Sequence, residues 1–184
     1  MKGATLPARA TAAATALLLV AAGCTTSHRP RRTSVVPVSV ADADLGDRGR
    51  RAAVAASSVE RHDGFTVGIV ELDDQGRFWD RRQLRALEAE VLGQAGGPED
   101  PGVVLTVFVH GWRHDARVCD ANLACFRELL RRISLDQREA LAARGGDARP
   151  RAVIGVFVGW RGLSSKAWPL EQLSFLGRKN AALR

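Results

Sequence analysis

The sequence predicts an α/β fold, with a mostly parallel sheet that is flanked by helices and starts with a β-hairpin. Three apolar runs rich in β-branched residues predict the main strands, at Phe65–Leu72, Val103–Val109 and Ala152–Trp160. Segments with helical spacing of apolar residues lie between and after these runs. Because strands that alternate with helices pair in parallel through crossover connections, this order indicates the α/β class.

The first strand is expected to form the hairpin. Residues 73–76 carry the turn signal Asp-Asp-Gln-Gly, and Arg77–Trp79 is expected to pair back onto the strand before it. Asp80 is then a good N-cap for a helix that ends near Gly93. The apolar face of that helix is formed by Leu84, Leu87 and Val91.

The second and third strands are continuously apolar, which is typical of strands covered by helices on both faces. A helix from roughly Asp120 to Ile133 is expected between them, and residues 136–146 either extend it or form a separate segment. After the third strand, helical spacing predicts a last helix through Leu170, Leu173, Leu176 and Ala181.

The N-terminus is expected to be an export signal over residues 1–23. Its basic start is followed by an apolar stretch from about Thr11 to Ala22, which is too short to span a bilayer. The sequence Ala21-Ala22-Gly23-Cys24 resembles the lipobox of bacterial lipoproteins, although Leu or Val is commoner at the position of Ala21. This resemblance implies export, acylation of Cys24 and anchoring to the lipid bilayer of the cell envelope. The alternative is an ordinary signal peptide, in which Cys24 has no role.

Residues 24–63 are expected to be a disordered tether, and residues 64–184 the folded domain. The tether region mixes Pro, Ser, Arg and Asp without a sustained period, and Pro37 argues against a central strand near it.

The formal net charge of +7 does not indicate a nucleic-acid partner. Basic residues are interspersed with acidic ones along the predicted helices, which is typical of solvated helix faces, and they form no stripe with aromatic residues.

The stretch "VVLTVFVHGWRHDA" (residues 103–116) carries the main functional signal. A buried strand stops abruptly at His110-Gly111-Trp112, and ligands of open parallel sheets gather at the carboxyl ends of strands. Gly111 allows a turn that directs backbone N–H groups at one point. Such preorganised donors are what a developing oxyanion requires.

The motif "VFVHGW" resembles the strand and oxyanion loop of the α/β-hydrolase superfamily, and the resemblance extends loosely over residues 65–184. It implies an ester or acyl-bond hydrolase in which the Trp112 N–H is an oxyanion donor, while His110 and Gly111 shape the turn. The alternative is that His110 is a structural histidine and Trp112 covers the sheet edge.

The catalytic groups of that superfamily are not found. No G-x-S-x-G nucleophile elbow occurs, and "GLSSK" (residues 162–166) lacks the second glycine. His110 and His114 precede any elbow, His62 is at the edge of the predicted domain, and His28 is in the predicted tether. We therefore expect an incomplete, truncated or inactive α/β-hydrolase fold without nucleophile, acid or base. The alternative is a non-catalytic envelope lipoprotein that uses the same scaffold to bind a ligand or partner.

Other residues are weaker candidates. His114, Asp115 and Arg161 are expected either at the rim of a pocket or as ordinary loop and ion-pairing residues. Cys119 and Cys125 form either a disulfide or two buried thiols, and the spacing of a metal site is absent. No metal and no organic cofactor are implied.

Overall fold

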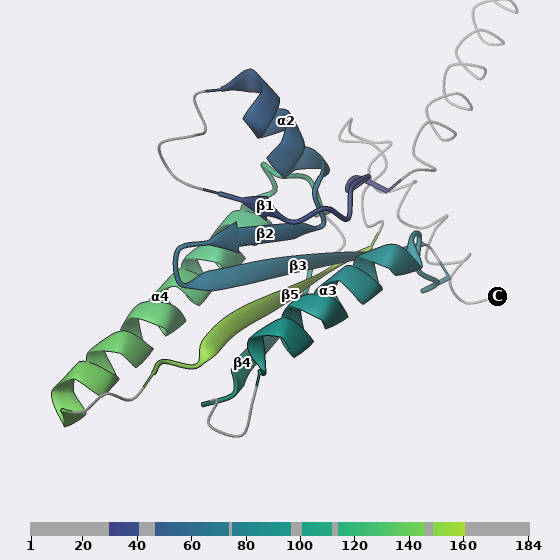
Figure 1. Cartoon of the computed structure of the whole chain (residues 1–184). Coiled ribbons are helices and arrows are strands. Elements are labelled where there is room, and N and C mark those ends of the chain that lie inside the picture. The colour runs from purple at the N-terminus through teal and green to yellow at the C-terminus, as the bar shows by residue number, and fades with distance from the viewer. Residues whose placement is uncertain are drawn as a thin grey trace, which may run out of the picture.

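The computed structural model describes residues 30–40, 47–73, 75–96, 101–111, 114–145 and 149–160. Within them, a five-stranded sheet carries helices α3 and α4 on its two opposite faces (Figure 1). The elements in chain order are β1 (Val38–Ser39), α2 (Arg48–Ala56), β2 (Val59–His62), β3 (Phe65–Leu72), α3 (Arg81–Gln94), β4 (Val103–Val109), α4 (Ala121–Arg144) and β5 (Ala152–Trp160).

The sheet has the order β1-β2-β3-β5-β4, so β5, the last strand among the described residues, lies between β3 and β4. Only β2 and β3 pair antiparallel, and the other three neighbouring pairs are parallel. The prediction of an α/β fold with a mostly parallel, helix-flanked sheet is confirmed.

The three apolar runs form strands with the predicted bounds, as β3, β4 and β5. The predicted N-caps are also confirmed: the Asp80 side chain accepts from the Arg82 N–H, and that of Asp120 accepts from the N–H groups of the first turn of α4. Helix α3 continues one residue past Gly93, to Gln94. Residues 136–144 extend α4, which ends before a glycine at positive φ, Gly145. The helix predicted through Leu170 lies outside the described residues.

Arg77–Trp79 pairs back onto β3 as predicted, but only through one antiparallel bridge, between Leu72 and Phe78. The regular antiparallel partner is β2, which is joined to β3 by a tight turn with Gly64 at a φ of 82°. A side chain is strained at that angle, and the Asp63-Gly64 pair is itself a hairpin signal.

The prediction of a disordered tether over residues 24–63 is wrong for its described part. Residues 30–40 and 47–63 contain β1, α2 and β2, and they bury Val54 and Val59. The polar composition was misleading because several of the polar residues are themselves buried, among them Arg32, Ser57 and Glu60. These groups are compatible with a folded interior because each has charged or backbone partners there.

The expectation that β4 is covered on both faces is also wrong for the described part of the chain. β4 is at the edge of the sheet, and only its Phe108 face packs against the α4 cluster. On the opposite face Leu105, Val107 and Val109 are 52–61% exposed. A continuous apolar run therefore does not distinguish a central strand from an edge strand.

The core has one apolar cluster on each face of the sheet. Phe126 and Leu130 of α4 pack against one face of β3 and β5, and Leu87 of α3 packs against the other. Glycines let both helices approach closely: a Cβ on Gly155 would collide with Leu130 and Phe126, and a Cβ on Gly68 would collide with Leu87. The helices therefore pack directly onto the strand backbones.

A buried ion cluster joins the N-terminal segment to the domain. The Arg32 side chain is fully buried, and its Nη1 lies 3.0 Å from Glu60 Oε1 on β2. The same guanidinium donates from Nε to the Ala116 carbonyl at 2.8 Å and from Nη1 to the carbonyls of Val54 and Ser57. Arg32 thus connects α2, β2 and the loop after β4.

Glu60 is held ionised at the centre of this cluster. Burial alone raises the pKa of its carboxyl, but hydrogen bonds from His62 and Arg127 and the charges of both arginines outweigh burial and hold the pKa at about 2. Arg127 on α4 supplies the strongest pairing, with two hydrogen bonds of 2.8 Å. Burial lowers the pKa of Arg32, and the charge of Glu60 opposes this change.

The cluster predicts a large difference between two arginine variants. Arg32→Met is expected to lower the free energy of unfolding by about 3 kcal/mol. The substitution removes one of the cations that pair with the buried Glu60 carboxylate, and it removes the hydrogen-bond donor of three backbone carbonyls. Arg131→Met, which removes an exposed partner of Glu128 on α4, is expected to have a much smaller effect. Urea unfolding of the two variants measures the difference, and equal losses would contradict the structural role of Arg32.

Candidate carboxyl-edge site

The carboxyl ends of β3, β5 and β4 meet at one edge of the sheet, because these strands are parallel. From this edge the chain leaves β3 toward α3 on one face, and it leaves β4 toward α4 on the other. Ligands of open α/β sheets bind at the carboxyl ends of the strands. At this edge Trp160 ends β5, which lies between β3 and β4.

His110 is fixed across this edge by three hydrogen bonds. Its Nε2 accepts from the backbone N–H of Trp160 at 2.9 Å, and its carbonyl accepts from the Trp160 indole at 2.7 Å. Its Nδ1 lies 2.7 Å from the Gly111 carbonyl. The imidazole is 2% exposed and stacks between Trp160 and Phe157.

These contacts determine the tautomer of His110. Because the Trp160 N–H donates to Nε2, the proton must be on Nδ1, which then donates to the Gly111 carbonyl. Burial lowers the pKa of His110, and the Gly111 carbonyl and the charge of Asp120 only partly oppose this effect. The imidazole is therefore neutral, and both nitrogens are occupied, so it has no free lone pair for general-base chemistry.

Gly111 directly follows this anchor at the end of β4. Around the position of its absent side chain there is open space, and its carbonyl also accepts from the His114 N–H at 3.1 Å. One backbone hydrogen bond thus joins residues 111 and 114. Trp112, the expected oxyanion donor, and Arg161, an expected rim residue, lie outside the described residues.

His114 and Asp115 are both half-buried and both paired. His114 Nδ1 lies 3.2 Å from each carboxylate oxygen of Asp120. Asp115 forms ion pairs with Arg31 at 3.5 Å and with Arg117 at 3.0 Å. Both side chains therefore stabilise the loop between β4 and α4.

Glu71, at the end of β3, holds the N-terminal segment at the same edge. Its carboxylate accepts the backbone N–H groups of Arg31 and Arg32 at 2.8 and 2.7 Å. Gln83 of α3 completes the arrangement, since its amide donates to the Arg32 carbonyl and accepts from the Glu71 N–H. Burial raises the pKa of Glu71, and the hydrogen bonds from the backbone and from Gln83 oppose it.

The sequence analysis missed this arrangement. The one signal present was a carboxylate inside an otherwise apolar strand, at Glu71 in "FTVGIVEL". A buried carboxylate requires partners, but the sequence does not show that those partners are backbone N–H groups some 40 residues earlier in the chain.

Cys119 and Cys125 are both free and both exposed. The structure therefore contains neither the disulfide nor the two buried thiols between which the sequence left the choice open.

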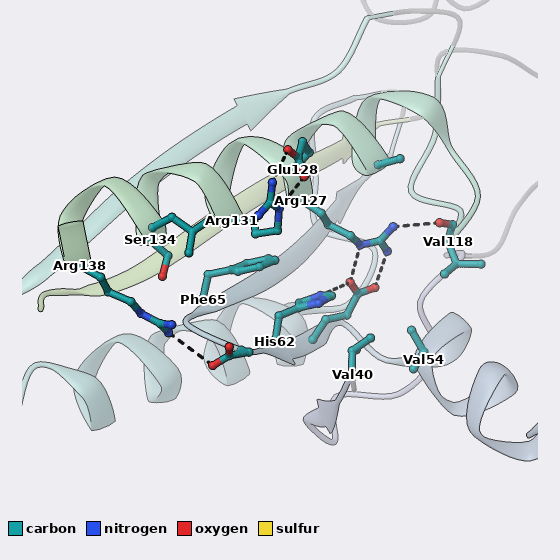
Figure 2. Close-up of a pocket in the computed structure, with 14 residues that line it drawn as sticks. Val40, Val54, His62, Phe65, Val118, Arg127, Glu128, Arg131, Ser134 and Arg138 are labelled. Atoms are coloured by element: carbon teal, nitrogen blue, oxygen red, sulfur yellow. Dashed lines mark hydrogen bonds and ion pairs between the residues drawn. The ribbon is translucent and has the colours of Figure 1, made fainter. Parts of the chain in front are cut away.

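A separate groove of about 710 Å³ runs beside α4, over β2 and the N-terminal segment (Figure 2). Apolar side chains from several elements line part of it, including Val40, Val54 and Phe65. The three arginines that line it each have an acidic partner, in the pairs Arg127–Glu60, Arg131–Glu128 and Arg138–Asp63. The groove is thus balanced in charge, and it was not predicted from the sequence.

The described residues contain no group of three or more His, Cys, Asp or Glu side chains that could hold a metal ion. Among the same residues, no helix has the length and apolarity needed to cross a membrane.

Comparison with protein-family models, with curated proteins and with solved structures gives no match to this chain. The resemblance to the α/β-hydrolase superfamily therefore rests on the sequence motif alone.

The environment of His110 predicts its titration. Its imidazole is expected to keep the neutral form, with the proton on Nδ1, to a lower pH than an ordinary histidine, whose pKa is about 6.5. Because the unfolded chain takes up that proton first, this residue makes the native state less stable as the pH falls below about 6.5. Imidazole ¹⁵N shifts between pH 8 and pH 5 measure both properties. Titration of His110 at or above the ordinary value would contradict the assignment.

Proposed function

We propose that this protein is a lipid-anchored envelope protein of the α/β-hydrolase type, and that its carboxyl-edge loop is an oxyanion-binding loop. The observation that carries the proposal is the clamp on His110, which fixes the end of β4 to the end of β5 directly before Gly111. A loop that must stabilise developing charge has to be held rigid before the reaction begins. A neutral, doubly bonded histidine at its base is suited to that task.

In this proposal the backbone N–H of Trp112 is the oxyanion donor. The reaction class is hydrolysis of an ester or related acyl bond, in which the carbonyl oxygen becomes negatively charged in the tetrahedral intermediate. We assign the chain the oxyanion loop and no nucleophile, since no G-x-S-x-G elbow occurs in the sequence. The chain by itself is therefore expected not to turn over esters.

The membrane anchor is the second part of the proposal. The sequence Ala21-Ala22-Gly23-Cys24 at the end of an apolar signal supports acylation of Cys24. Two or more acyl chains give stable anchoring, which one chain does not.

A second candidate function is non-catalytic binding of a ligand or partner. The groove beside α4 supports it, because its volume of about 710 Å³ is within the range of small-molecule sites. This function places the ligand at α4 and β2, well away from Gly111, so a ligand map distinguishes the two candidates.

The oxyanion loop is tested by NMR titration of the ¹⁵N-labelled chain with butylphosphonate, an anionic tetrahedral mimic, and with neutral butanamide. We expect saturable shifts for the phosphonate at the amides of Gly111 and Trp112 and at the Trp160 indole, and weak shifts for the amide. Trp112→Phe keeps the backbone N–H and should keep binding, whereas Trp112→Pro removes it and should abolish binding.

Two results would contradict the proposal. Phosphonate shifts confined to the groove beside α4 would favour the binding function instead. Hydrolysis of p-nitrophenyl butyrate above the buffer rate, lost in Trp112→Pro but not in Trp112→Phe, would show that the chain does contain a nucleophile.

A further inference from the structure

The N-terminal segment enters the fold at the carboxyl edge of the sheet. Arg31 and Arg32 donate their backbone N–H groups to Glu71 at the end of β3. Arg31 also pairs with Asp115, and the Arg32 side chain donates to the Ala116 carbonyl, so both residues contact the loop after β4. The N-terminal segment is therefore fixed to the domain at Arg31 and Arg32.

The entry point is next to the candidate site. A Cβ added at Gly159 would lie 2.9 Å from the Ala116 side chain and 3.3 Å from that of Glu71. Gly159 directly precedes Trp160, which holds His110. The two residues that receive the N-terminal segment thus lie against the same strand end as the clamp of the candidate oxyanion loop.

Little chain is left between this point and the lipidation residue. Six residues separate Cys24 from Arg31, and the seven steps between the two, at about 3.5 Å each, span at most about 25 Å even when fully extended. A tether that continued to Gly64, as the composition suggested, would have reached about 140 Å. The ordered segment therefore shortens the reach of the domain more than fivefold.

This length is short compared with the domain itself. β5 has nine residues and is about 30 Å long. The opposite edge of the sheet is therefore about 30 Å from the point where the connection enters the domain, which is more than the reach of about 25 Å that the connection has. An anchored domain thus keeps its carboxyl edge nearest the bilayer. Arg29, within the connection, adds attraction to anionic headgroups.

We propose that the protein holds its carboxyl edge, with the His110 loop, against the membrane surface. This inference rests on the proposed function for the acylated Cys24.

Energy transfer to the membrane tests the orientation. The acylated chain is reconstituted in phosphatidylcholine–phosphatidylglycerol vesicles that contain a headgroup-labelled acceptor lipid. A donor dye is placed at the native Cys119, at the carboxyl edge, in a Cys125→Ser chain. The matched chain carries the dye at Arg149→Cys, before β5 at the opposite edge, with Cys119 and Cys125 replaced by serine and Cys24 kept. A third chain has about twenty Gly-Ser residues inserted after Thr26.

Because the edges are about 30 Å apart, we expect transfer from Cys119 to be at least about twofold greater than from residue 149. The insertion should remove this difference. Equal transfer from both labels in the parent chain, or greater transfer from residue 149, would overturn the inference.

Flotation separates this inference from the proposed function. The parent chain should float with the vesicles, and Cys24→Ser should not. A parent chain that fails to float refutes the lipid anchor and the inference together. A chain that floats but transfers equally from both edges refutes only the orientation, and the phosphonate titration tests the oxyanion loop independently of either result.

Discussion

The guanidinium group of Arg32 lies out of contact with water, between Glu60 on β2 and the Ala116 carbonyl after β4. Removing a charged group from water costs several kcal/mol, so this position requires an ionised partner and satisfied hydrogen bonds at the same time. That requirement accounts for the low pKa of Glu60, for its pairing with Arg127, and for the three backbone carbonyls that converge on one side chain. It also makes the N-terminal segment part of the domain.

Two sets of buried hydrogen bonds hold the carboxyl edge together. Glu71 fixes the N-terminal segment to the end of β3, and His110 fixes the end of β4 to Trp160 of β5. Burial acts on both groups: it raises the pKa of Glu71, which is surrounded by hydrogen-bond donors, and it lowers the pKa of His110. The ends of β3, β4 and β5 are thus each tied to a neighbouring segment at this edge.

Local patterns in the sequence were sufficient for the elements but not for their arrangement. The apolar runs gave β3, β4 and β5 their bounds, and Asp80 and Asp120 marked two helix starts, because these signals depend only on neighbouring residues. The position of β5 between β3 and β4, and the exposed face of β4, depend on contacts far apart in the chain. The His110 loop was found because its motif is local. The roles of Arg32 and Glu71 were missed because their partners are 12 to 84 residues away.

Native-state hydrogen exchange tests most directly whether Arg31 and Arg32 are part of the fold. The amides of Arg31 and Arg32 donate to a buried carboxylate, so they should exchange only with global unfolding, as slowly as the core amides of β3. Glu71→Gln should speed their exchange while β5 stays protected. Exchange of both amides at the rate of an unstructured chain, in the unaltered protein, would contradict the account.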